Sequence, residues 1–399
     1  MTRSAAPTEV SLAKVAFRFV LIIGIINLFA DMTYEGGRSI AGPFLGSLGA
    51  SATVVGFVAG FGELVGYGLR SITGYFADRT RRYWVAVFTG YTVNMLAVPG
   101  LALAGHWPAA AMLMIAERTG KAIRKPSVEA LLSRAGEVIG HGWVFGLNEA
   151  LDQAGATIGP LITALVLYHR GGYHHAFALL LIPALLCLGT VAVARLLHPQ
   201  PLASVDRTAR LPETKGFSKA YWLYLGASAL LAAGFADFSL VAFHFQKTAI
   251  VSESLIPVFY SAAMASGALA ALICGRLLDK VGWPVLLGAF SLAALFAPFV
   301  FLGGFSLALI GAVLWGVGMG AQDSLLKATI AGVIPSEKRS TAFGVFDTGF
   351  GIAWFLGSAA MGMLYDWSIP ALVAFSVIFQ LAALPVFILA RRAIRSNPA

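Results

Sequence analysis

The sequence has little charge and little cysteine. Only 12% of its 399 residues are Asp, Glu, Lys or Arg, and 58% are hydrophobic, whereas soluble globular domains carry about 25% charged residues. A soluble chain of this length would need polar surface around two or three cores, and it has too few polar residues for that. Most of the chain consists of apolar stretches of about 20 residues, the length of a helix that crosses a bilayer. The shortage of charge therefore predicts a multi-pass membrane protein.

Several kinds of catalytic and metal-binding motif are also missing. The sequence shows no glycine-rich phosphate loop, zinc motif or nucleophile elbow, so we expect no enzyme activity and no cofactor. The two cysteines, Cys187 and Cys274, lie within apolar stretches without metal-ligand spacing, and we interpret them as packing residues. His169, His174 and His175 have no carboxylate beside them, so interfacial histidines are favoured over a metal site.

Breakers and short polar segments divide the chain into twelve predicted helices. The separators include Gly42-Pro43 and Ile369-Pro370. The one long polar segment, 198–219, is interpreted as a cytoplasmic linker between an N-terminal bundle, 1–197, and a C-terminal bundle, 220–399. The expected fold is an all-α membrane protein of two pseudo-symmetric six-helix bundles. The helices are predicted at 17–37, 50–77, 84–104, 108–132, 143–168, 174–196, 220–244, 256–279, 284–303, 305–331, 341–364 and 370–391.

The positions of the basic residues predict the orientation of the chain. Most Lys and Arg residues lie in the terminal segments, the linker and alternate loops, whereas the other set of loops holds only Arg38, Arg170 and Lys247. Because short cytoplasmic loops are enriched in Lys and Arg, we expect both termini to be cytoplasmic and the protein to lie in the cell (inner) membrane. The loops thereby account for the net charge of +9, and no nucleic-acid partner is expected.

Three short patterns occur twice, at equivalent helix positions and about 200 residues apart. Since each repeat contains six helices, an even number, both copies have the same orientation in the membrane. This is the parallel-repeat arrangement, in which a site lies between the two halves. The patterns are Phe29-Ala30-Asp31 with Phe235-Ala236-Asp237, Gly74-x-x-x-Asp78-Arg79 with Gly275-x-x-x-Asp279-Lys280, and Phe145-Gly146-x-x-Glu149 with Phe343-Gly344-x-x-Asp347.

The second of these patterns resembles the signature of the major facilitator superfamily between its second and third helices. The usual glycine after the Asp-Arg pair is missing here, and the second copy keeps Gly282 but lacks the basic pair after it. The resemblance implies a twelve-helix transporter. The glycines would allow close helix approach, and the aspartates would pair with bases or cap a neighbouring helix and so close the cytoplasmic side. The residues of this predicted cytoplasmic gate are Gly74, Asp78, Arg79, Arg82, Gly275, Asp279 and Lys280.

The fifth predicted helix resembles the antiporter signature of exporters in that family. Thr163 and Ala164 stand where the family has a closing glycine pair. Small residues on one face permit tight packing, and a proline bends a helix. Ordinary packing glycines are the alternative interpretation, but the full spacing favours export over uptake. The residues of this motif are Gly146, Gly155, Gly159 and Pro160.

Ionisable residues within the predicted helices are the main candidates for a site. Each costs about 3 kcal/mol to place at the centre of a bilayer, so it needs a partner or a function. A spacing of four residues puts Asp31 and Glu35 on one face of the first helix. Most of these residues lie in the N-terminal half. The candidates for proton coupling or for the substrate cavity are Asp31, Glu35, Glu63, Tyr67, Arg70, Arg118, Lys121, Glu149, Asp152, Asp237 and Asp347.

Two interpretations of these charges compete. In a structural one, Arg118 and Lys121 pair with Glu149, Asp152 or Glu63 and hold helices together. In a functional one, the same groups line a central cavity and exchange partners with protons and substrate, since a base that moves away from a carboxylate changes its protonation. The number of acids and bases favours the second. The barer C-terminal half is expected to present an apolar wall of aromatic residues such as Phe243, Trp315, Phe346, Phe350 and Trp354.

These observations predict a proton-coupled exporter of a small organic molecule, monomeric in the lipid bilayer and working by alternating access. The bases on the fourth helix leave room for an anionic or zwitterionic substrate, and a cationic compound bound by the carboxylates is the rival. Within the transporter class, the alternatives are a proton- or ion-coupled importer of a metabolite, a metal or a metallophore. A membrane sensor that has this fold but does not transport is the alternative from another class, although retained intramembrane charges favour transport.

Overall fold

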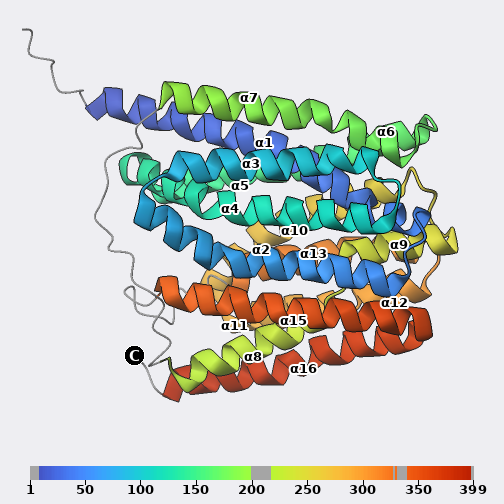
Figure 1. The fold of residues 1–399 in the computed structure, drawn as a ribbon. Helices are drawn as coiled ribbons and strands as arrows, with labels where there is room; N and C mark the ends of the chain where they lie inside the picture. Colours follow the sequence, from blue (N-terminus) through green and yellow to red (C-terminus); the bar gives the residue numbers. More distant parts are fainter. Residues whose placement is uncertain (1–8, 199–216, 327–328, 330–338, 397–399) are drawn as a thin grey trace, which may run out of the picture.

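The computed structural model describes residues 9–198, 217–326, 329 and 339–396, and over these residues it is a bundle of long helices with no strand. The helices lie side by side along one axis (Figure 1). Eleven helical segments are long and apolar enough to cross a membrane. The fourth long helix, α4, has 33 residues and carries the row of charges predicted for it. The expected all-α membrane fold is confirmed.

The helices of the first six membrane spans correspond, in chain order, to the first six predicted helices. They are α1 (Glu9–Ser47), α2 (Ala52–Thr80), α3 (Tyr83–Gly100) continued by the 3-10 turn η1 (Leu101–Leu103), α4 (Trp107–Ile139), α5 (His141–Tyr168), and α6 (Gly172–Leu179) with α7 (Leu181–Leu197). The last six spans are α8 (Lys219–Gly234) with α9 (Phe238–Thr248), α10 (Ile256–Val281), α11 (Trp283–Ala293) with α12 (Phe296–Leu302), α13 (Phe305–Ala321) continued by the π-helix η2 (Gln322–Leu326), α15 (Arg339–Trp367) and α16 (Ile369–Ser396).

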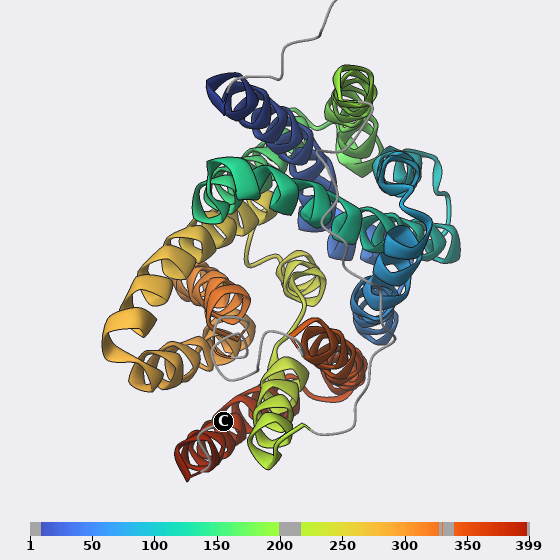
Figure 2. The same ribbon diagram turned by 90° about the vertical axis from the view of Figure 1, so that its left-hand side faces the viewer.

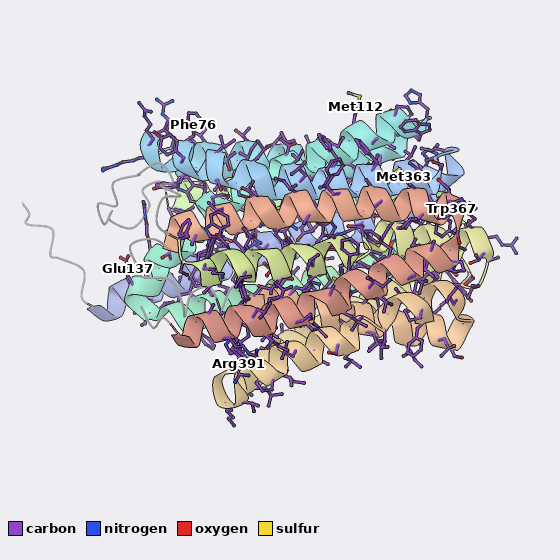
Figure 3. The ribbon with its side chains drawn as sticks, turned by 90° about the horizontal axis from the view of Figure 1, so that it is seen from below. Phe76, Met112, Glu137, Met363, Trp367 and Arg391 are labelled. Carbon is purple, nitrogen blue, oxygen red and sulfur yellow. The ribbon has the colours of Figure 1, made fainter. Side chains whose placement is uncertain are left out.

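The two ends of the bundle can be told apart by the helix ends. α1 begins and α16 ends on one side, here called the termini side; α1 ends and α2 begins on the other, here called the opposite side (Figure 1). Large apolar side chains such as Met112, Met363 and Trp367 project outward and are more than half exposed (Figure 3). An outward apolar surface is what a bilayer solvates.

The end of the first helix differs from the sequence prediction. Gly42-Pro43 was expected to separate two helices, but α1 continues through both residues to Ser47. Close packing against α9 occupies this end of α1, because a Cβ at Gly42 would lie 1.8 Å from the carbonyl oxygen of Ser239. Arg38, which was assigned to a loop, therefore lies inside a membrane-spanning helix.

The seventh span differs from the expected continuous helix over 220–244. It is broken between α8 and α9, and a break frees backbone groups that find no water in a bilayer. Side chains of other helices take up these groups: the Gly234 carbonyl accepts from Ser376 Oγ at 2.6 Å and Gln380 Nε2 at 3.2 Å, and the Ala236 carbonyl accepts from Trp315 Nε1 at 2.8 Å. Side chains of α13 and α16 thus satisfy the Gly234 and Ala236 carbonyl groups at the break.

The N-terminal and C-terminal halves of the chain form two groups of helices when seen along the bundle (Figure 2). The most extensive contacts between the groups are those of α2 with α15, α5 with α10, and α1 with α9. Small residues allow this approach, since a Cβ at Gly56 would lie 2.4 Å from the Ser358 carbonyl oxygen, and one at Gly60 would lie 2.8 Å from Ser358 Cβ.

The glycines of α5 give a prediction about packing. A Cβ at Gly155 or Gly159 would lie 2.3 Å from a carbonyl oxygen of α1, whereas a Cβ at Gly146 would have no atom within 4 Å. Gly159→Val should therefore lower the stability by about 1–3 kcal/mol, as overpacking does, and Gly146→Val should change it little. Thermal unfolding of the purified variants in detergent measures the difference. Equal melting temperatures would contradict the close contact between α1 and α5.

Candidate functional site

The site is built around Glu63 of α2, which lies between two arginines. Arg38 Nη2 of α1 lies 3.0 Å from Glu63 Oε1, and Arg118 Nη2 of α4 lies 3.2 Å from the same oxygen. All three side chains are about nine-tenths buried. Arg118 and Glu63 were predicted as partners, and the structure brings them together; Arg38 was not predicted.

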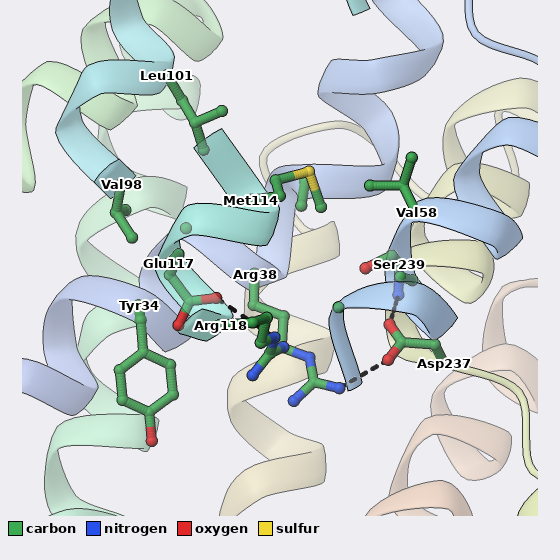
Figure 4. A pocket seen from close by; sticks show the side chains of 14 residues that line it. Tyr34, Arg38, Val58, Val98, Leu101, Met114, Glu117, Arg118, Asp237 and Ser239 are labelled. Carbon is green, nitrogen blue, oxygen red and sulfur yellow. Dashed lines mark hydrogen bonds and ion pairs between the residues drawn. The ribbon is translucent and has the colours of Figure 1, made fainter. Parts of the chain in front are cut away.

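Arg38 also connects the two halves of the chain. Its Nη2 donates to Asp237 Oδ2 at 2.7 Å, and Asp237 is 2% exposed at the break between α8 and α9. The other oxygen of Asp237 accepts the backbone N–H of Ser239 at 2.8 Å and so caps α9. Figure 4 shows Arg38 reaching across to this carboxylate. The guanidinium group of Arg38 therefore forms an ion pair with one carboxylate from each half.

Glu117 completes this group of charges, here called the Glu63 cluster: Arg38, Glu63, Glu117, Arg118 and Asp237. Its Oε2 lies 3.3 Å from Arg118 Nε, and its Oε1 accepts from Asn94 Nδ2 at 2.8 Å. When all its members are ionised, the cluster holds two cations and three carboxylates. It therefore has one negative charge in excess, which a single proton would neutralise.

A cavity of about 40 Å³ adjoins the cluster. Its polar side is formed by Arg38, Arg118 and Asp237, and its apolar side includes Val98 and Met114 (Figure 4). A space of this size can hold a water molecule. Arg38 Nε is buried and has no hydrogen-bond partner among the described residues, so the cavity contains at least one unsatisfied donor group.

A second contact between the halves involves Glu35. The hydroxyl group of Tyr260 in α10 donates to Glu35 Oε2 in α1, and both residues are buried. Glu35 and Arg38 are three residues apart on α1, so one face of this helix makes both contacts with the C-terminal half. Protonation of Glu35 would remove the charged acceptor of this hydrogen bond.

Asp31 lies one turn from Glu35 on the same face of α1 and is 7% exposed. Lys121, Glu35 and Arg124 lie near enough to act on it electrostatically. Lys121 Nζ lies 3.9 Å from the centre of the Tyr34 ring, a cation–π contact. No ion pair joins Asp31 to the bases of α4 in the described part of the structure, so their association stays a prediction.

Asp152 belongs to a separate polar network within the N-terminal half. Asn148 Nδ2 donates to Asp152 Oδ2 at 3.3 Å, and Asn27 Nδ2 donates to Asn148 Oδ1 at 2.8 Å. Arg124 stacks on Tyr91 at 4.3 Å and donates to its hydroxyl oxygen at 3.0 Å; Tyr91 in turn donates to Asn27. This network joins α1, α3, α4 and α5.

Other predicted residues lie apart from the Glu63 cluster. Glu149 is exposed on α5 and accepts from Gln153 Nε2 at 2.9 Å. Arg70 stacks on Tyr67, with its guanidinium carbon 4.5 Å from the ring centre. Tyr67 and Asp347 line a second cavity, of about 20 Å³, between α2, α13, η2 and α15. The sequence analysis had placed these residues in one candidate group with Asp31 and Arg118, but the structure does not bring them together.

The predicted cytoplasmic gate is described only in part. The side chains of Asp78 and Asp279 lie outside the described part of the structure, so their latch role stays a prediction. A Cβ at Gly74 would lie 3.3 Å from Pro126 Cβ of α4, whereas one at Gly275 would meet open space.

The basic residues of the predicted gate are exposed at the termini side. Arg79 Nη1 donates to the hydroxyl oxygen of Tyr75 at 3.3 Å, and Arg82 precedes the first turn of α3. Lys280 is exposed in the last turn of α10. They occupy the side that the distribution of Lys and Arg predicts to be cytoplasmic.

A contact on the opposite side was not foreseen. Asp366, near the end of α15, accepts hydrogen bonds from Thr53 N at 2.8 Å, Thr53 Oγ1 at 2.7 Å and Ala52 N at 3.3 Å. A carboxylate at a helix N-terminus satisfies free N–H groups and interacts favourably with the helix dipole. Asp366 therefore ties the C-terminal half to the start of α2.

Removal of this capping charge should loosen the opposite side. In a Cys187→Ala/Cys274→Ala background, Ala41→Cys places a thiol in the wall of the cavity beside the Glu63 cluster. Asp366→Asn should raise the rate of its reaction with a polar maleimide in detergent by up to about tenfold, the equivalent of one lost charge-assisted hydrogen bond. Glu137→Gln, which removes an exposed carboxylate near the termini side, should leave the rate unchanged. An unchanged rate in Asp366→Asn would argue against this tie.

A double-mutant cycle tests the bridge made by Arg38. Arg38→Met leaves two buried carboxylates without this cation and should cost about 3–5 kcal/mol, the usual effect of breaking a buried pair. The double variant Arg38→Met/Asp237→Asn should lose less than the sum of the single variants, measured by thermal unfolding. Arg195→Met, an exposed arginine, is the control. Additive losses would show that Arg38 and Asp237 do not interact.

Comparisons with known proteins agree with this architecture. The family model described as Major Facilitator Superfamily matches residues 20–358. An uncharacterised protein of Mycobacterium tuberculosis is 40% identical over 375 residues, which are 92% of each chain. An uncharacterised transporter of the same superfamily type from Methanocaldococcus jannaschii is 26% identical over 366 residues, 88% of this chain and 89% of that protein.

Solved structures share the fold at low identity. A bacterial homologue of the human lysosomal transporter Spinster, inward-facing and unoccupied, has a TM-score of 0.75 at 15% identity and covers 96% of this chain and 99% of its own. A peptide transporter in complex with sulfate has a TM-score of 0.74 at 16% identity, covering 95% of this chain and 94% of its own. With its helices, its repeats and the match over residues 20–358, the chain belongs to the major facilitator superfamily.

Proposed function

We propose that this transporter uses the proton gradient to export a small organic molecule by alternating access. Membership of the family makes the chain a multi-pass membrane transporter. The observation that carries the rest is the Glu63 cluster, in which Arg38 binds Glu63 of one half and Asp237 of the other. Because the contact between Arg38 and Asp237 crosses between the halves, any movement that separates the halves on this side must break it.

The ionised cluster holds the empty carrier closed on the opposite side. Separating Arg38 from Asp237 in a medium of low dielectric constant is costly unless water or a proton replaces the lost partner. The empty, deprotonated carrier therefore stays closed there, and only a bound substrate offsets the cost of opening. The carrier therefore cannot change its conformation when neither substrate nor proton is bound. An exchanger requires this property.

Protonation provides the reverse step. When the halves are apart, the separated carboxylates Asp31, Glu35, Glu63 and Asp237 become accessible to protons from that side. A protonated carboxyl group can re-enter the apolar interior without a cation. The halves then close, and loss of the proton on the termini side restores the ion pair with Arg38 and the hydrogen bond from Tyr260. One proton would suffice for the excess negative charge of the cluster.

Two further observations support export from the cytoplasm. The distribution of Lys and Arg favours a cytoplasmic termini side, so the opposite side, to whose end of α2 Glu63 lies nearer, would be external. The antiporter-like glycines Gly155 and Gly159 hold α5 against α1, which is the helix that carries Asp31, Glu35 and Arg38. Packing of this kind lets α1 and α5 move as one body.

Flux measurements test the proposal. A compound found by thermal-shift screening is added to acid-loaded proteoliposomes, and antiport predicts that it enters the acidic lumen while the lumen becomes alkaline. Asp31→Asn and Glu35→Gln should abolish uphill movement but keep exchange of the compound between its two sides at equal pH, because the binding site remains. Glu253→Gln is the control.

Three results would count against the proposal. Movement of the compound together with protons would indicate an importer. Uphill movement at the wild-type rate in both variants would remove the proposed coupling residues. Absence of any flux in a correctly folded wild-type protein would favour a protein that does not transport.

A further inference from the structure

The second cavity lies between the two halves of the chain. α2 contributes Tyr67 from the N-terminal half, and the C-terminal half contributes the remaining wall. Three of the lining side chains come from one stripe of α15, at a spacing of four residues. The lining residues are Tyr67, Met319, Gln322, Asp323, Leu326, Phe346, Asp347, Phe350 and Trp354.

Two buried polar atoms in this wall have no partner. Trp354 is 2% exposed and Gln322 is 5% exposed, yet Trp354 Nε1 and Gln322 Oε1 make no hydrogen bond among the described residues. An unsatisfied buried donor or acceptor costs about 1–3 kcal/mol. A donor and an acceptor left in one cavity indicate a ligand that supplies the complementary groups.

Aromatic rings surround these polar atoms. Phe346 and Phe350 lie 5.8 Å apart between ring centres, Phe350 and Trp354 5.7 Å, and Tyr67 and Phe350 5.7 Å. Gln322 and Asp323 lie on the π-helix η2, a local distortion that is frequent at functional sites. Clusters of aromatic faces attract organic cations through their π electrons.

The charges favour a cation as well. Asp347 makes no hydrogen bond or ion pair in the part of the chain that the structure describes, whereas Arg118 and Arg124 of α4 are engaged with Glu63, Glu117 and Tyr91. Among the described residues, the cavity wall contains two carboxylates, Asp323 and Asp347, and no Lys or Arg. Arg70 is the nearby base and stacks on Tyr67. The carboxylate of Asp347 therefore offers a negative charge that a cationic ligand can balance.

We propose that this cavity is the substrate site of the proposed transporter and that it selects small aromatic amines in their cationic form. The ammonium group would donate to Asp347 and to Gln322 Oε1, and its ring would pack among Phe346, Phe350 and Trp354. Trp354 Nε1 would donate to an acceptor elsewhere on the substrate. The inference rests on the proposed function and decides between the anionic and cationic substrates that the sequence left open.

The cavity must widen to admit such a molecule. Its present volume of about 20 Å³ accommodates little more than a water molecule. Its wall belongs to both halves, so it opens when α2 moves away from α13 and α15. Glu63 and Tyr67 are four residues apart on α2 and share a face, so the same movement changes the Glu63 cluster.

Three probes with one ring and different head groups test the charge preference. 2-Phenylethylamine, 2-phenylethanol and phenylacetate are titrated calorimetrically into the purified full-length protein. The amine should bind at least about tenfold more tightly than the alcohol or the acid, as expected for charge-assisted hydrogen bonds. Asp347→Asn should abolish that preference while leaving the melting temperature unchanged, because Asp347 has no partner to lose. Glu253→Gln should keep the wild-type preference.

The outcomes separate this inference from the proposed function. Preferential binding of phenylacetate, equal binding of all three probes, binding of none, or an unchanged amine preference in Asp347→Asn would overturn the substrate assignment. Asp31→Asn serves as the second arm, since it should retain amine binding and lose pH-driven uptake in proteoliposomes. Amine binding without any pH-driven uptake in the wild type would leave the substrate class standing and would refute the proton coupling.

Discussion

The structure depends on one buried guanidinium that serves two carboxylates. Arg38 lies where water is scarce, and Glu63 and Asp237 would repel each other without it. Because Glu63 belongs to the N-terminal half and Asp237 to the C-terminal half, the electrostatic requirement of one side chain becomes a constraint on the whole molecule. The halves can separate on this side only if the charge of Arg38, Glu63 or Asp237 is otherwise compensated.

Backbone geometry makes that contact possible. α1 must continue past Gly42-Pro43 for Arg38 to stand within a helix, and the seventh span must break for Asp237 to cap α9 and still face α1. The break in turn requires partners for its carbonyl groups, which Trp315, Ser376 and Gln380 provide. Glycines bring the helices close enough for these side chains to reach. Charge, broken helix and close packing are therefore interdependent.

The α2 helix connects the proposed coupling and binding sites. Glu63 is held by the two arginines, and Tyr67, one turn further along the same face, closes the cavity that contains Asp347. Asp366 caps the first turn of the same helix from the other half. A helix that is held at its end, at its centre and along its contact with α15 is suited to respond as a unit when one of these contacts changes.

The sequence by itself determined the number of spans and most of their boundaries, because the thickness of a bilayer imposes a length that apolar stretches reveal directly. It also predicted Asp31 and Asp237 as equivalent positions, and through the cost of burying charges it named Glu63 as one of three candidate partners of Arg118. It missed Arg38, since the prediction ended the first helix at residue 37, although Arg38 follows Asp31 by two turns on the same face. Only the tertiary structure decided that Asp237 caps a broken helix while Asp31 lies within a continuous one, and that Asp366 reaches Thr53 at a distance of 313 residues along the chain. The physical reason is that burial depends on local composition, whereas the choice of partner depends on how helices rotate and pack against one another.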